Sequence, residues 1–160
     1  MEKDHYIGVD ISKRTIDVAV YAKNQVKKGT FPHETFSNSG DGFKDMKRWL
    51  RKQNATLSKS LFCMEATGNY TYELCLFLEQ LGIAYSIQSP LHLKRSFGLT
   101  HGKNDKVDAS RIAYYAYLHR EDIKLSKLAS ESVRKLKSLI AERKSLIAEI
   151  ARCKAQLKEA

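Results

Sequence analysis

The stretch Tyr6-Ile7-Gly8-Val9-Asp10 is short, apolar and rich in β-forming residues, and it ends on an acid. It therefore predicts a β-strand with a carboxylate at its end. After the polar turn 11–14, the alternating segment Thr15 to Tyr21 predicts a second strand, antiparallel to the first. Residues 30–37 predict a third strand, in which Pro32 indicates a sheet edge or a bulge.

The elements that follow alternate between helix and strand. They are a helix over 42–53 with Ser39 as its N-cap, an apolar strand over 61–64, a helix over 70–81, a strand over 83–88 and a short helix that opens at Pro90. The continuous apolar run at 61–64 is typical of a strand buried on both faces. This order predicts an α/β fold: a mixed five-stranded sheet with helices on both faces, the ribonuclease-H-like layout.

The last part of the chain is expected to be helical. Residues 105–118 predict one helix after a basic loop at 98–104, and a long helix is expected from Ser132 onward. The seam of this long helix follows a 3-4 spacing that is typical of a coiled coil: Leu136, Leu139, Arg143, Leu146, Ile150, Cys153 and Leu157. We therefore expect one domain over 1–120 and a coiled-coil arm over 121–160.

Composition excludes several classes of protein. The 160 residues are 42% apolar and 29% charged, a globular balance, and no run of about 18 apolar residues predicts a membrane span. Three cysteines without a CxxC pair argue against a disulfide framework or a thiolate zinc site, and favour the cytoplasm. The net charge of +10 is concentrated in residues 91–160, which suits a DNA or RNA partner or, equally, a solvated helical surface.

Four acids stand at the ends of predicted elements. Asp10 ends the first strand, Glu65 follows the buried run, and Asp105 and Asp108 lie three apart at a helix start, on one side of it. Each alone is typical of a structural role, such as a helix cap for Asp105. Together they predict one carboxylate cluster that needs divalent cations, because like charges repel at short range. Carboxylate oxygens suit two Mg²⁺ ions, for which Mn²⁺ can substitute.

Three blocks follow one another in the sequence: Gly8 to Lys13 with Thr15 to Ala19, Glu65 to Tyr70, and Lys103 to Ala109. Together they resemble the DEDD insertion-sequence transposases, a family with a RuvC-like N-terminal domain that includes bridge-RNA-guided recombinases and Piv-type DNA invertases. The sequence departs from the family pattern at Asn104, where relatives often have Thr.

The resemblance implies that Asp10, Glu65, Asp105 and Asp108 are the catalytic metal ligands of a Mg-dependent transposase or recombinase. It also implies a bridge RNA as guide, DNA as substrate and a nucleoid-associated protein of the prokaryotic cytoplasm. Relatives continue into a C-terminal domain with a serine nucleophile, so we expect this chain to be a truncated form that is inactive alone.

Basic residues near the acids are candidates for binding the phosphate backbone, although a solvated surface explains any one of them equally well. They are Lys13, Arg14, Lys94, Arg95, His101, Lys103 and Lys106. The apolar seam of the long helix predicts a homodimer or a higher homo-oligomer. Packing against a further part of the same chain is the alternative.

Three other functions remain open from sequence. One is a stand-alone nuclease that resembles Holliday-junction resolvases. Another is a non-catalytic module for nucleic-acid binding and dimerisation. The third is a sugar-kinase or actin-type ATPase, which also opens with a Gly-x-Asp motif but needs glycine-rich phosphate loops that this sequence lacks.

Overall fold

The computed structural model describes residues 3–24, 31–97 and 105–159, and only the backbone at 97, 105–107 and 158–159. Its centre is a mixed five-stranded sheet in the order β3-β2-β1-β4-β5. The strands are β1 (His5–Ile11), β2 (Thr15–Ala22), β3 (His33–Ser37), β4 (Ser60–Glu65) and β5 (Ala84–Gln88). β1 pairs antiparallel with β2 and parallel with β4. The predicted mixed five-stranded sheet is therefore confirmed, and β1 is its central strand.

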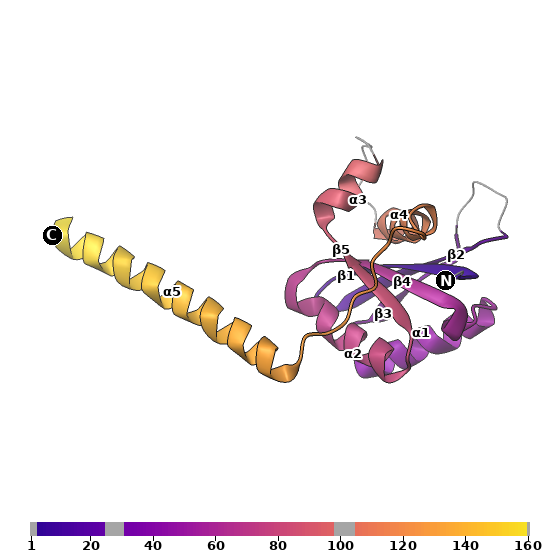
Figure 1. Ribbon diagram of the computed structural model, residues 1–160, viewed down its shortest axis with the longest axis horizontal. Coiled ribbons are helices and arrows are strands. Elements are labelled where there is room, and N and C mark those ends of the chain that lie inside the picture. Colours follow the sequence, from indigo (N-terminus) through magenta and orange to yellow (C-terminus); the bar gives the residue numbers. More distant parts are fainter. Residues whose placement is uncertain (1–2, 25–30, 98–104, 160) are drawn as a thin grey trace. The chain divides into compact units, whose positions relative to one another are not determined.

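Helices cover both faces of the sheet (Figure 1). On one face lie α1 (Gly40–Lys52) and α2 (Tyr72–Gln80), which meet through the rings of Phe43 and Phe77, 5.5 Å apart. α2 contacts the sheet where Sγ of Cys75 lies 3.8 Å from Sδ of Met64. On the other face lies α4 (Asp105–Leu118), whose Ile112 and Ala113 pack on Tyr6 and Cys63. The short helix α3 (Pro90–Phe97) follows β5, and its Leu93 belongs to the same apolar cluster between α4 and the sheet.

Helix α4 comes very close to the sheet at Gly8. A Cβ at this position would lie 2.1 Å from the carbonyl oxygen of Ala109 and 2.3 Å from the backbone nitrogen of Ala113. Only glycine permits this contact. Further along α4, the ring of Tyr117 packs 5.4 Å from that of Tyr6. α4 therefore runs opposite to β1, and its first turn lies at the end of the sheet where β1 ends.

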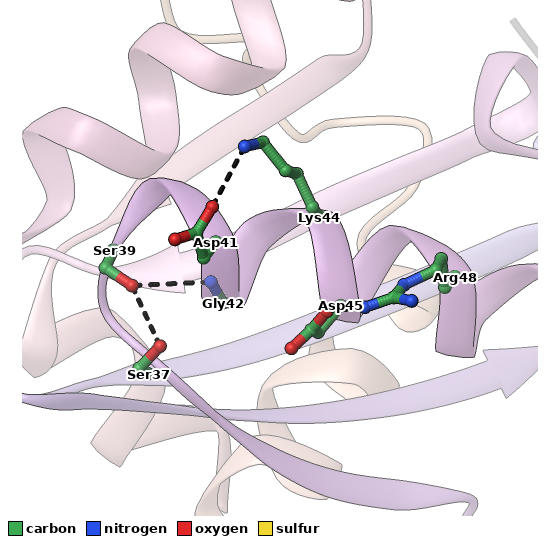
Figure 2. A network of polar contacts seen from close by, with 7 residues as sticks. All are labelled: Ser37, Ser39, Asp41, Gly42, Lys44, Asp45 and Arg48. Carbon is green, nitrogen blue, oxygen red and sulfur yellow. Dashed lines mark hydrogen bonds and ion pairs between the residues drawn. The ribbon is translucent and has the colours of Figure 1, made fainter.

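A small polar network fixes the start of α1 (Figure 2). The Ser39 hydroxyl is 2.8 Å from that of Ser37 and accepts a hydrogen bond from the backbone N–H of Gly42. Gly42 has no room for a side chain, because its Cβ would lie 2.0 Å from the carbonyl oxygen of Ser37. The prediction of Ser39 as N-cap is confirmed, and only Asn38 and Ser39 separate the end of β3 from the start of the helix.

Several predicted boundaries differ from the structure by one to three residues. β3 begins at His33, after Pro32, whose carbonyl accepts from the N–H of Val20 at the sheet edge. The helix predicted over 70–81 begins with a 3₁₀ turn, η2 (Gly68–Thr71), before α2. β5 begins at Ala84, one residue later than predicted, and a short 3₁₀ turn, η1 (Leu57–Lys59), precedes β4.

The chain divides into two compact units, Met1–Lys127 and Leu128–Ala160. The first includes the segment after α4, because the carbonyl of Lys124 accepts from the Ser86 hydroxyl and the N–H of Ser126 donates to the Tyr85 carbonyl. The second contains the helix α5 (Glu131–Glu159). Leu139, Leu146 and Leu157 of its predicted seam are exposed, so coiled-coil pairing stays a prediction. Within the described residues, no helix combines the length and the apolar character needed to cross a membrane.

Candidate functional site

Asp10 and Glu65 lie next to each other at the carboxyl ends of two parallel strands. The register pairs Gly8 with Cys63 and Val9 with Met64, so Asp10 and Glu65 are the next residues on β1 and β4. Side chains alternate between the faces of a sheet. Asp10 therefore shares a face with Gly8, and Glu65 shares one with Cys63. Both are on the α4 face, and both are partly exposed.

The first turn of α4 brings a third carboxylate to the same end of the sheet. Asp108 precedes Ala109, the residue that rests on Gly8. Its Oδ1 lies 3.5 Å from Nη1 of Arg111 one turn along the helix, and the Asp108 side chain is 38% exposed. The backbone of Asp105 begins α4, one turn further toward the helix start, but its side chain is outside the described residues.

The loops at this edge are tied together by Asn38. Its Nδ2 donates to the carbonyl of Ser12, 3.0 Å away, and to the carbonyl of Tyr70, 3.1 Å away. Its backbone N–H donates to the carbonyl of Arg14. Asn38 thus links the turn after the strand of Asp10 to the turn after the strand of Glu65. No pattern in the sequence pointed to this residue.

Glu65 has a fixed polar neighbour on β5. The register pairs it with Gln88, whose Nε2 donates to the Ser86 hydroxyl at 2.7 Å. The Tyr115 hydroxyl of α4 donates to Oε1 of Gln88 at 3.4 Å. Burial raises the pKa of Tyr115, so its hydroxyl keeps its proton and remains a donor. These contacts hold α4 against the outer strand.

The apolar floor under the carboxylates is chemically inert. Cys63, two residues before Glu65, is buried, and this burial raises the pKa of its thiol to about 12. Cys75 is also buried, with its pKa raised to about 12, and all three cysteines are free. The thiols therefore supply no metal-ligating thiolate at this edge.

The donor chemistry of the site fits a hard divalent cation. Asp10, Glu65 and Asp108 offer only carboxylate oxygens, which Mg²⁺ and Mn²⁺ prefer. Within the part of the chain whose side chains are described, however, no three His, Cys, Asp or Glu side chains are gathered closely enough to hold a metal ion. The carboxylates share one end of one face of the sheet, but they do not form a closed ligand set there.

The predicted basic residues fall into two groups. Lys13 and Arg14 form the exposed tip of the β1–β2 turn, directly beyond Asp10, and Lys94 and Arg95 are exposed on α3. His101 and Lys103 lie outside the described residues, as does the side chain of Lys106.

Comparison with known proteins agrees with this architecture. Residues 7–160 match the family model of the IS110-type DEDD transposases, described as "Transposase". Two relatives, each called a pilin gene-inverting protein, come from Moraxella bovis and Moraxella lacunata. Both are 31% identical over an alignment of 141 residues, and the match covers 86% of this chain and 41% of each relative. The chain thus spans about two fifths of the length of these relatives.

Two solved structures of RuvC from Thermus thermophilus are similar in fold at 12% sequence identity. Both matches cover 76% of this chain and 99% of RuvC. The TM-score is 0.51 for one structure and 0.52 for the other, which is described as a complex with a Holliday junction substrate. The fold is therefore RuvC-like, as expected. Because the family model spans nearly all of the sequence, the chain belongs to the IS110-type DEDD transposase family.

Proposed function

We propose that residues 1–120 form the catalytic domain of a DNA transposase or recombinase that cleaves and transfers phosphodiester strands. The observation that carries this proposal is the placement of Asp10 and Glu65 on adjacent parallel strands, with the first turn of α4 at the same end of the sheet. Membership of a transposase family and the RuvC-like fold support it.

In this proposal, Asp10, Glu65, Asp105 and Asp108 hold two Mg²⁺ ions, or Mn²⁺ in their place. When bound, such ions activate a nucleophile and stabilise the leaving oxygen of a phosphodiester. The residues of α4 and the strand ends supply the ligands, and Gly8 sets the distance between helix and sheet.

The basic residues bind the nucleic-acid backbone in this proposal. Lys13 and Arg14 extend from the turn directly after β1, where a phosphate beside Asp10 is within reach of a long side chain. Lys94 and Arg95, together with His101, Lys103 and Lys106, make the second group. The partners are DNA and, as the family resemblance implies, a bridge RNA that guides target choice.

We also propose that α5 pairs with α5 of a second copy to form a homodimer. Its exposed leucines recur at coiled-coil spacing, and burying them against a second helix removes apolar surface from water. Leu146→Glu is expected to convert the dimer into a monomer in sedimentation experiments, whereas Lys144→Glu, at an exposed position outside the seam, is expected to leave it intact.

The test of the catalytic proposal is recombination of a plasmid substrate in cells that express the full-length protein, because this proposal expects the 160-residue chain alone to be inactive. Asp10→Asn, Glu65→Gln and Asp108→Asn each remove one charge at nearly constant shape, and each is expected to reduce recombination at least a hundredfold. Asp41→Asn is the matched control, since Asp41 is an exposed acid that pairs with Lys44 on α1 (Figure 2). Recombination by Asp10→Asn at the control level would refute the assignment.

A stand-alone junction nuclease is a second candidate, favoured by the similarity to nearly the whole length of RuvC. It predicts that the 160-residue chain alone cuts branched DNA when Mg²⁺ or Mn²⁺ is added. The transposase proposal instead expects no cutting by this chain alone, so one nuclease assay separates the two functions.

A further inference from the structure

A row of polar side chains crosses all five strands of the sheet at the level of Asp10. The register pairs Thr35 with Asp17 and Asp17 with Asp10; Glu65 is next to Asp10 and is itself paired with Gln88. Residues paired in register point to the same face of a sheet. The row therefore lies on the face covered by α4. It contains a third strand carboxylate, Asp17, that the proposed ligand set does not include.

The carboxylate of Asp17 is held by β3. Thr35 Oγ1 donates to Asp17 Oδ1 at 2.5 Å. Nε2 of His33 lies 3.3 Å from the same oxygen, without the alignment of a hydrogen bond. The side chains of His33 and Asp17 are each only 13% exposed. Asp17 therefore presents a negative charge that is fixed in place on the β3 side of β2.

This fixed charge acts on Asp10. Residues directly opposite each other in an antiparallel pair have Cα atoms about 4.5–5.5 Å apart. Two carboxylates at that spacing repel, and Asp17 is restrained by Thr35. The repulsion disfavours the orientations of Asp10 that point toward β2. In the proposed site a cation would compensate the charge of Glu65 but not that of Asp17, which leaves the orientation toward β4 favoured.

We propose that Asp17 is a positioning residue of the site, which directs the Asp10 carboxylate toward Glu65 and adds to the negative potential that holds a divalent cation there. This inference rests on the proposed function, because it assumes that Asp10 is a cation ligand. It assigns to the β2–β3 edge of the sheet a role that the four predicted ligands do not cover.

Two substitutions separate the charge of Asp17 from its restraint. Asp17→Asn removes the charge but keeps the shape and an oxygen that accepts from Thr35. It is expected to weaken Mn²⁺ binding about three- to tenfold, the effect of one charge on a divalent ion at roughly 6 Å in a solvent-exposed site. Thr35→Val removes the donor at constant shape and is expected to weaken binding by a smaller factor. Because both act through one carboxylate, the double variant is expected to match Asp17→Asn alone.

The experiment is a Mn²⁺ titration of the 160-residue chain followed by electron paramagnetic resonance, with thermal unfolding measured on the same samples. Asp41→Asn removes an acid on α1, which covers the face of the sheet opposite α4. The Mn²⁺ affinity of this variant is expected to be within twofold of that of the unsubstituted chain. Asp10→Asn is expected to lose site-specific binding. Asp17→Glu keeps the charge and is expected to rescue most of the affinity.

The outcomes distinguish the inference from the proposed function. If Asp10→Asn abolishes Mn²⁺ binding but Asp17→Asn and Thr35→Val bind within twofold of the unsubstituted chain, the positioning role is wrong and the cation site stands. If Asp17→Asn lowers the melting temperature but leaves the Mn²⁺ affinity unchanged, Asp17 only connects β2 to β3, and this result also overturns the inference. If Asp10→Asn binds Mn²⁺ as well as the unsubstituted chain, or that chain binds none, the cation site fails and the inference fails with it. Should Asp17→Asn not fold, Thr35→Val, which leaves Asp17 in place, decides the question.

Discussion

Gly8 of β1 lies directly under Ala109 of α4, so close that a single methyl group at Gly8 would overlap the helix backbone. The contact sets the height of α4 above the sheet, and with it the height of Asp108 above the strand ends. The atoms in the way belong to the backbone and not to a flexible side chain, so the helix as a whole must move to relieve the overlap.

Gly8→Ala is therefore expected to destabilise the protein by about 1–3 kcal/mol through overpacking. The measurement is the free energy of unfolding in urea. Gly40→Ala is the control: no atom lies within 4 Å of the Cβ position of Gly40, and its place in α1 favours alanine. Equal stability of Gly8→Ala and the unsubstituted chain would show that α4 does not rest on Gly8 as described.

The cysteines report on the same helix. Cys63 lies on β4 under α4, and Cys75 lies on α2 and faces the sheet. Both are buried, with pKa values raised to about 12, whereas Cys153 on α5 is exposed. A thiol reagent at pH 8 is expected to label Cys153 rapidly, and to label Cys63 and Cys75 only on the time scale of local opening. Mass spectrometry of the labelled peptides identifies which cysteines have reacted. Fast labelling of Cys63 in the native protein would mean that α4 does not cover β4.

Much of the fold could be predicted from the sequence, because each element carries a local signal. The apolar run before Glu65, Pro32 at the sheet edge and Ser39 at the start of α1 each matched the structure. The predicted start of α2 did not match the structure. A 3₁₀ turn and an α-helix have nearly the same periodicity over the four residues from Gly68, so the sequence pattern could not separate them.

The candidate site could be predicted only in part, because it depends on register. Asp17 was visible as an alternating residue of the second strand. Its position beside Asp10 follows only from the tight turn that Lys13 and Arg14 make between the two strands, closed by the hydrogen bond from Ser12 N–H to the Thr15 carbonyl. Asn38 carried no periodic signal at all, because its contacts are with the backbones of two turns that are distant in the sequence.

His5 gives the protein a pH dependence. Its Nδ1 is buried without a hydrogen-bond partner, and burial lowers the pKa of the imidazole below its usual 6.5, against a smaller opposing effect of Asp4. The unfolded chain therefore binds more protons in this range than the folded one, so the contribution of His5 to stability is present above pH 6.5 and is lost as the pH falls through the folded pKa. His5→Gln is expected to flatten the dependence of unfolding free energy on pH between 7 and 5. An unchanged slope would contradict the burial of a neutral His5.

Asn38 offers the sharpest test of how the site is held together, since one side-chain amide donates to two turns that flank the carboxylates. Asn38→Ala leaves the carbonyls of Ser12 and Tyr70 without these donors, and is expected to lower the free energy of unfolding by about 1–3 kcal/mol. Asn38→Asp replaces the donor by an anion that faces the same carbonyls, so a larger loss of unfolding free energy is expected.

Amide hydrogen exchange is expected to speed up at Ser12 and Thr15, because Asn38 restrains the turn that contains them. Asn24→Ala, in an exposed turn at the far end of β2, is the control and is expected to change neither quantity. Unchanged exchange at Ser12 and Thr15 in Asn38→Ala would show that the turn after Asp10 holds its shape without the clamp.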